Sequence, residues 1–219
     1  MFFGIDLTSK ETKPSACLCL DDKLEVAYCG LLKKDSDIVS EVGHYSPKII
    51  AIDAPLSLPL GLCCLKESCG CQPKFQWKGR LCERELAHIQ IYCYFTTKKS
   101  IIKGMVERAI KLQEKLAQQG REIIEIYPYA SKVRLFGRPI PRKQRAEGRS
   151  WLREKVSIIL DNQMPFLERW SHDMCDAALA AYTGYLYVHG ETEAVGSAEE
   201  GLIYIPKSSC GHTESGLAT

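Results

Sequence analysis

The chain has 219 residues, of which 45% are hydrophobic and 26% charged, and its formal net charge is +2. This length predicts one domain, and the balance of apolar and charged residues excludes an intrinsically disordered chain. No apolar run reaches the roughly 20 residues of a membrane span. The first six residues end in an acid and lack the basic region of a signal peptide. We therefore expect a cytoplasmic protein without membrane spans.

The first half of the chain is rich in short apolar runs, which are typical of buried strands. The predicted elements, in chain order, are strands at 2–7, 16–20 and 24–30, a short helix at 35–42, and a strand at 48–53. The next segment, 61–82, contains Gly, Pro and Trp without a clear period. We interpret it as an irregular, cysteine-rich insertion.

The second half alternates helical and strand patterns. The predicted elements are helices at 83–92 and 101–116, a strand at 122–128, a basic loop at 131–149 with at most one short helix, helices at 150–160 and 171–189, and an edge strand at 202–206. Such alternation favours an α/β fold with a mixed sheet. We expect one domain over 1–207 and a flexible tail at 208–219.

Several acids stand where predicted strands end or a helix begins. Asp6, Asp53 and Glu125 lie in or just after apolar strand cores. Asp173 and Asp176 are three residues apart and share one helix face. Singly, each acid is also explained as a structural cap. Together they would repel one another at one sheet edge, and Mg²⁺ or Mn²⁺ would relieve that repulsion. We predict that Asp6, Asp53 and Asp176 hold such ions.

Five of the eleven cysteines fall within the insertion. They are Cys63, Cys64, Cys69, Cys71 and Cys82. Four thiolates suit Zn²⁺ or an iron–sulfur cluster, and a short loop without its own core gains stability from a metal. We choose Cys64, Cys69, Cys71 and Cys82 as ligands. Unligated structural thiols and redox thiols are the alternatives, and spacing alone does not separate zinc from iron–sulfur.

A basic block follows the insertion. Residues 98–155 hold 16 Lys and Arg against 6 Asp and Glu, which favours a polyanionic partner, although a solvated helix face is the alternative. Six basic residues between 131 and 146, with no acid among them, are candidates to contact nucleic-acid phosphates: Lys132, Arg134, Arg138, Arg142, Lys143 and Arg145. Phe136 and Trp151 either stack bases or belong to the core.

An ordered set of motifs resembles a known family. The motifs are Gly4-Ile5-Asp6-Leu7-Thr8, Ile52-Asp53-Ala54-Pro55, Arg80-x-Cys82-Glu83-Arg84-Glu85-Leu86, Glu125-x-Tyr127-Pro128 and His172-Asp173-x-x-Asp176-Ala177. Together they resemble a family of uncharacterised proteins, catalogued as a domain of unknown function, that are predicted nucleases with an RNase H-like fold. The last motif also resembles the final catalytic motif of RuvC-type Holliday junction resolvases.

The resemblance implies three antiparallel strands followed by strands parallel to the first. It implies metal-dependent phosphodiester hydrolysis by a two-metal mechanism, with Asp6, Asp53, Asp173 and Asp176 as catalytic acids and Glu125 as a ligand or supporting group. Thr8 and Ser9 are candidates to contact a phosphate. His172 is a candidate proton donor, and Arg80, Glu83 and Arg84 either line the site or pair on a helix surface. A homodimer is one expected arrangement.

Two other functions stay open at this point. The first is a non-catalytic protein of the same fold that binds nucleic acid or senses a metal or iron–sulfur cluster. The second is a phosphotransferase of the actin-like superfold, whose first phosphate loop resembles residues 4–9. That superfold duplicates its domain, and this chain is too short for two such domains.

Overall fold

The computed structural model describes residues 1–161 and 167–208 of the chain. The strands are β1 Phe2–Asp6, β2 Ser15–Leu20, β3 Val26–Leu32, β4 Ile49–Asp53, β5 Glu122–Ile126, β6 Thr192–Ser197 and β7 Gly201–Pro206. The helices are α1 Asp35–Tyr45, α2 Leu81–His88, α3 Lys103–Ala117, α4 Pro128–Phe136, α5 Ala146–Ile159 and α6 His172–Val188, with a short 3₁₀ turn at Leu167–Arg169.

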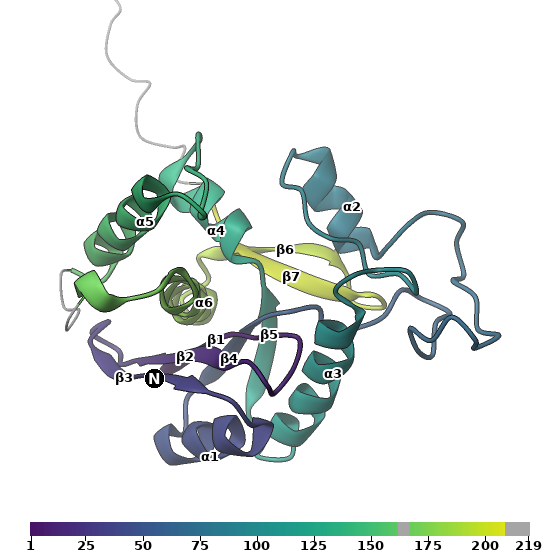
Figure 1. Ribbon diagram of the computed structural model, residues 1–219, viewed down its shortest axis with the longest axis horizontal. Helices are drawn as coiled ribbons and strands as arrows, with labels where there is room; N and C mark the ends of the chain where they lie inside the picture. The colour runs from purple at the N-terminus through teal and green to yellow at the C-terminus, as the bar shows by residue number, and fades with distance from the viewer. Residues whose placement is uncertain (162–166, 209–219) are drawn as a thin grey trace, which may run out of the picture.

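The strands form one mixed sheet in the order β3-β2-β1-β4-β5-β7-β6. Strands β1, β2 and β3 pair antiparallel, whereas β4 is parallel to β1, β5 to β4, and β7 to β5. At the far edge, β6 pairs antiparallel with β7. The expected α/β class, with three antiparallel strands followed by parallel strands and flanking helices, is confirmed (Figure 1).

Alternation along β1 and β4 divides the core between the two faces of the sheet. Phe2 and Ile49 pack with α5 and α6 on one face, whereas Phe3 and Ile50 pack with α1 and α3 on the other. The two helix layers lie on opposite sides of the sheet in Figure 1. This period of two residues fixes which face each strand-end side chain reaches.

Helix α6 lies directly on β1 because Gly4 has no side chain. A Cβ on Gly4 would lie 2.1 Å from the carbonyl oxygen of Ala177 and 2.3 Å from the amide nitrogen of Ala181. The small residues of α6 permit this approach, and Gly184 continues the contact toward Ile49. The first turns of α6 are therefore held beside the end of β1.

Two predictions for the second half of the chain were wrong. Strand 202–206 was expected at an edge, but β7 lies between β5 and β6. The sequence of β6, Thr-Glu-Ala-Val-Gly-Ser, is too polar to be identified as a strand alone. The expected basic loop at 131–149 contains α4, which begins with Pro128 in its first turn, and the start of α5 at Ala146.

The insertion is irregular, as predicted: residues 54–80 form neither helix nor strand. The predicted flexible tail at 208–219 lies outside the described residues from position 209 onward. Among the described helices, none combines the length and the apolar character that crossing a membrane requires. The division into one domain over 1–207 stays a prediction.

Candidate functional site

Three carboxylates lie near one another where β1, β4 and α6 come together, although their oxygens are not all within 4.8 Å of one another in the described structure. Asp6 and Asp53 end β1 and β4 and are direct partners in the parallel register, so their backbones are about 4.8 Å apart. Each lies two residues after a residue that faces α6, Gly4 in β1 and Ala51 in β4, so both point to the α6 side of the sheet. Asp176 is buried in α6, one turn after the exposed Asp173. The sequence had predicted this convergence from strand-end placement.

Electrostatics in this site are dominated by buried negative charge. Burial, together with the neighbouring carboxylates of Asp53, Asp176 and Asp173, raises the pKa of Asp6 well above 3.8. Burial, followed by the charge of Asp176, raises the pKa of Asp53 to about 8. Among the described residues, no hydrogen bond or ion pair engages either side chain. These two carboxylates therefore have an unmet need for a cation or a proton.

Asp176 differs from its neighbours because it has cationic partners. Lys132 Nζ lies 2.6 Å from Oδ1 of Asp176, and His172 Nδ1 lies 3.0 Å from Oδ2. Burial alone would raise the pKa of Asp176, but Lys132 and His172 hold it below its usual value. Within the described chain, Asp176 Oδ1 and His172 Nδ1 nevertheless lack a hydrogen bond of good geometry. The group is thus charge-paired but not fully satisfied.

Glu125, which the resemblance offered as a ligand or supporting group of the site, does not join the three aspartates. It shares the strand face of Ile123, opposite to the face of Ile124 and Ile126. Arg80 Nη1 and Nη2 donate to its two oxygens at 2.7 and 2.6 Å, and the Leu56 amide donates at 2.8 Å. Glu125 therefore positions the chain just after Asp53, and its oxygens are already used.

Arg80 is the centre of this second network, which lies in the interior rather than on a helix surface. It is fully buried and also donates from Nε to Glu83 at 3.0 Å. Glu83 also accepts a hydrogen bond from the Arg80 amide and one each from the amide and the hydroxyl of Thr96. The sequence missed Glu200, which accepts from the amides of Leu60 and Leu81. Its position after a turn gave no signal for this role.

The six predicted phosphate contacts divide into two groups. Three have partners within the chain: Lys132 pairs with Asp176, Arg134 with Glu193 and Ser208, and the exposed Arg138 with the carbonyl of Gln90. Because Lys132 is buried, its prediction as a nucleic-acid contact was wrong.

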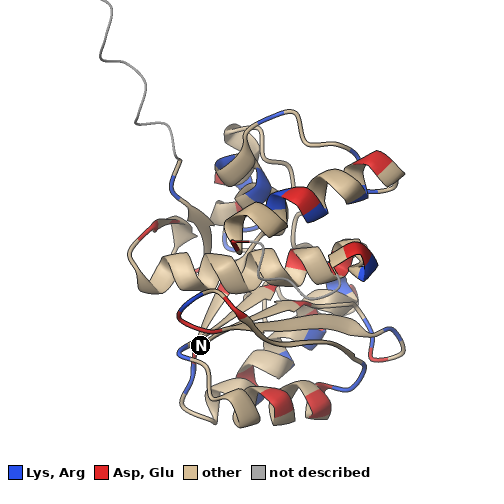
Figure 2. Cartoon of the chain, turned by 90° about the vertical axis from the view of Figure 1, so that its left-hand side faces the viewer, with Lys and Arg blue, Asp and Glu red and all other residues tan. Residues whose placement is uncertain are grey.

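The other three, Arg142, Lys143 and Arg145, are exposed between α4 and α5. Lys143 is near enough to the site to act on the pKa of both Asp6 and Asp53, in the lowering direction. Figure 2 shows Lys and Arg segments in the upper part of the molecule, the height of α4 and α5 in Figure 1. Lys143 therefore brings positive charge close to the carboxylates of Asp6 and Asp53.

For Phe136 and Trp151 the structure supports the core alternative, and Thr8 has partners within the chain. Phe136 and Trp151 contact each other edge to face at 5.7 Å and pack against the core under α6, so neither presents a free ring to a base. Thr8 Oγ1 donates to the carbonyls of Lys10 and Lys13 and accepts from Arg108. This hydroxyl therefore closes the turn after β1 and does not project toward a phosphate.

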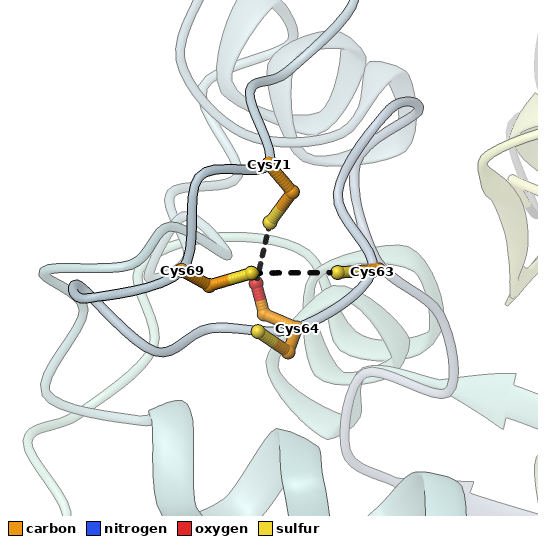
Figure 3. Close-up of side chains that lie close together, drawn as sticks. All are labelled: Cys63, Cys64, Cys69 and Cys71. Atoms are coloured by element: carbon orange, nitrogen blue, oxygen red, sulfur yellow. Dashed lines mark hydrogen bonds between the residues drawn. The ribbon is translucent and has the colours of Figure 1, made fainter.

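Four cysteines of the insertion form a second candidate site. The sulfurs of Cys63, Cys64, Cys69 and Cys71 all lie within 4.8 Å of one another, with Cys63 and Cys69 at 3.6 Å. Figure 3 shows the four side chains gathered around one point. Backbone hydrogen bonds with Cys63 and Cys64 lower the pKa of Cys71 to about 6. Lys98 secures the loop by donating to the carbonyls of Cys69 and Cys71.

The fourth cysteine of this cluster is Cys63. Cys82, which we predicted as a ligand from the sequence, does not belong to it. Cys82 is fully buried in α2, in an apolar cluster with Leu86 and Val195. The Cβ of Cys82 occupies the space that a side chain at position 196, a glycine in β6, would need. A residue packed against β6 is unable to serve the insertion, and burial raises the pKa of its thiol to about 12.

Comparison with known proteins gives a family and a structural neighbour but no function. No curated protein matches the sequence. Among solved structures, the chain is similar to "Thermus thermophilus RuvC structure", with 13% identity, 86% of this chain and 95% of that chain covered, and a TM-score of 0.46. A family of uncharacterised proteins matches residues 4–200. The chain belongs to the family described as "Protein of unknown function (DUF429)".

Proposed function

We propose that this protein is a divalent-metal-dependent nuclease. The observation that carries the proposal is the pairing of two half-buried, unpartnered carboxylates, Asp6 and Asp53, beside the buried carboxylate of Asp176. Hard cations such as Mg²⁺ or Mn²⁺ match this oxygen-only donor set. When bound, they activate water and stabilise the charge that develops at a phosphodiester.

Residues of the chain would bind the ions and the phosphate backbone. Asp6 and Asp53 are free to hold an ion as they stand. Asp176 would bind a second ion only if Lys132 moved away, because the ammonium group of Lys132 is paired with Oδ1 of Asp176. The exposed Arg142, Lys143 and Arg145 would hold the phosphate backbone, so affinity would fall steeply with salt.

The test combines cleavage with metal binding. Labelled DNA and RNA, single-stranded, duplex and branched, are incubated with Mg²⁺ or Mn²⁺ and with Asp6→Asn or Asp53→Asn. We expect cleavage only with metal, and a loss of 100-fold or more, on the order of one removed catalytic donor, in either variant. Calorimetry should show Mn²⁺ binding lost in the same variants. Asp37→Asn, an exposed acid on α1, is the control and should behave as wild type.

The outcomes separate the nuclease from a non-catalytic protein. Metal binding that depends on Asp6 without cleavage of any substrate would contradict the nuclease and favour a nucleic-acid-binding or metal-sensing role. Cleavage that survives Asp6→Asn would place the active site elsewhere.

We also propose that Cys63, Cys64, Cys69 and Cys71 bind a single Zn²⁺. A tetrahedral zinc–thiolate centre has Zn–S bonds of about 2.3 Å, which puts its sulfurs about 3.8 Å apart. The four sulfurs here lie within 4.8 Å of one another and match that size. An iron–sulfur cluster adds irons and sulfides between its thiolates, so it needs a wider cage.

Metal analysis of the purified chain tests this site. We expect one zinc per chain, and cobalt replacement should give the visible absorption of a tetrahedral thiolate complex. Cys69→Ser should lose the metal, whereas Cys82→Ser should keep it. A coloured preparation with iron and sulfide would contradict the zinc site, as would a metal content that depends on Cys82.

A further inference from the structure

The proposed function leaves a groove beside the insertion unused. A cavity of about 660 Å³ lies between the insertion and residues 94–101. Its walls include the rings of Trp77, Tyr94 and Phe95 and the amines of Lys78 and Lys99. None of the residues that line this groove in the described chain is an acid. The groove is therefore aromatic and positively charged.

Two of these rings stand in solvent although they are large and apolar. Trp77 is 52% exposed and Tyr94 is 64% exposed. Exposed aromatic surface is costly to keep in water, and clusters of it mark binding sites. Here rings and lysines line the same groove, which is the combination that binds bases and phosphates.

Trp77 is held in place before any ligand arrives. Its ring stacks on Phe75 at 4.7 Å with an interplanar angle of 21°, and the guanidinium of Arg84 lies 4.9 Å from its centroid. Arg84 is in turn fixed by donating to the carbonyl of Gly79 at 3.0 Å. A pre-positioned ring loses little conformational entropy when a ligand stacks on it.

The groove leads toward the carboxylates. Tyr94 lines both this groove and a smaller cavity whose walls include Asp53, Arg80 and Glu125. Tyr94 therefore lies between the groove and the end of β4, where Asp53 is located.

We propose that this groove binds single-stranded nucleic acid, with unpaired bases stacked on Trp77 and Tyr94 and with phosphates near Lys78 and Lys99. The proposal rests on the proposed nuclease function and names its substrate class. Duplex bases are already stacked on each other and offer no free faces, whereas unpaired bases stack on aromatic side chains regardless of sequence. A single strand thus uses both chemical features of the groove.

The experiment measures binding apart from cleavage. Full-length Asp6→Asn protein, with its cysteine site intact and no added Mg²⁺, is titrated against fluorescent oligothymidine and against a duplex of equal length. We expect the single strand to bind more tightly than the duplex. Adding Trp77→Ala or Tyr94→Ala should each weaken single-strand binding about tenfold, while Trp77→Phe should restore most of it.

Two exposed positions away from the groove serve as controls. Leu31→Ala on β3, at 57% exposure, and Lys23→Ala in the first hairpin should leave affinity unchanged. Circular dichroism confirms that each variant is folded. Equal affinity of the groove variants and the parent protein would overturn the proposal. So would tighter binding of duplex, or binding of acidic peptides in place of oligonucleotides.

The two proposals fail in different ways. Cleavage that needs Asp6 but single-strand binding that ignores Trp77 and Tyr94 would overturn the groove and leave the nuclease standing. Binding that depends on both rings, without cleavage by wild-type protein under any metal, would support the groove and contradict the nuclease.

Discussion

Single side chains determine the charge balance at the carboxylates, and Lys132 contributes most. It is buried, and its ammonium pairs with Asp176 at 2.6 Å. Lys132→Met leaves three carboxylates without this cation, so we expect a loss of about 3–5 kcal/mol in the free energy of unfolding. Mn²⁺ should recover part of the loss by taking the vacated position. Urea denaturation with and without Mn²⁺ measures both effects.

Lys132→Arg is the control for this prediction because it keeps the charge. A variant Lys132→Met that is as stable as wild type would show that Asp176 does not depend on this pairing. If its stability falls but Mn²⁺ recovers nothing, Asp176 is not an ion ligand.

Protonation of Asp53 makes the metal-free protein pH-sensitive. Burial, then Asp176, raises the pKa of Asp53 from 3.8 to about 8. Between these values the folded chain binds a proton that the unfolded chain releases, so stability falls as pH rises. The slope for one such proton is about 1.4 kcal/mol per pH unit. Denaturation in chelator between pH 5 and pH 8 measures it.

Asp53→Asn should reduce this slope, because the amide does not ionise, while Asp6, whose pKa is also raised, keeps its own contribution. Asp37→Asn should leave the slope unchanged. A metal-free protein whose stability is constant across this window would contradict the raised pKa.

Packing of whole elements decides whether these side chains meet. The contact of α6 with β1 is the critical one, because Asp173 and Asp176 reach Asp6 only through it. Gly4→Ala would put a Cβ 2.1 Å from the backbone oxygen of Ala177. We expect this substitution to displace α6, cost about 3 kcal/mol or more of stability, and weaken Mn²⁺ binding. Thermal denaturation and calorimetry measure the two effects.

Gly70→Ala is the matched control, since nothing lies within 4 Å of the Cβ it would add. It should leave stability and Mn²⁺ affinity unchanged. Normal Mn²⁺ binding by Gly4→Ala would show that the carboxylates do not need this close approach.

Across the whole molecule, the cysteine site and the groove are linked by the irregular segment 54–80. This segment lacks regular structure, so its shape depends on the thiolates and on Lys98. We expect Cys69→Ser to weaken single-strand binding at Trp77 several-fold, because loss of zinc loosens the wall of the groove. Mn²⁺ binding at Asp6 and Asp53 should persist, because these residues belong to the sheet.

Cys29→Ser, an exposed thiol on β3, should change neither property. Binding titrations with oligothymidine and with Mn²⁺ compare the two variants, Cys69→Ser and Cys29→Ser. If Cys69→Ser loses zinc yet binds the single strand normally, the metal does not shape the groove.

Local pattern was sufficient for much of the architecture. The apolar runs ending at Asp6 and Asp53 identified two buried strands, and the spacing of Asp173 and Asp176 identified one helix face. The alternation of side chains along a strand then determines that Asp6 and Asp53 share a face. These features are encoded within a few consecutive residues, so the sequence by itself determined them.

Other features depended on which distant segments meet. Glu125 lies one residue before the end of its strand, so it faces the other side of the sheet from the aspartates, where Arg80 binds it. Lys132 lies in a basic run, yet the packing of α4 beside α6 makes it the partner of Asp176. Cys63 belongs to the cysteine cluster and the predicted Cys82 does not, because Cys82 lies in α2, which packs on β6. Only the tertiary structure decided these roles, because each partner comes from a segment that sequence spacing does not place.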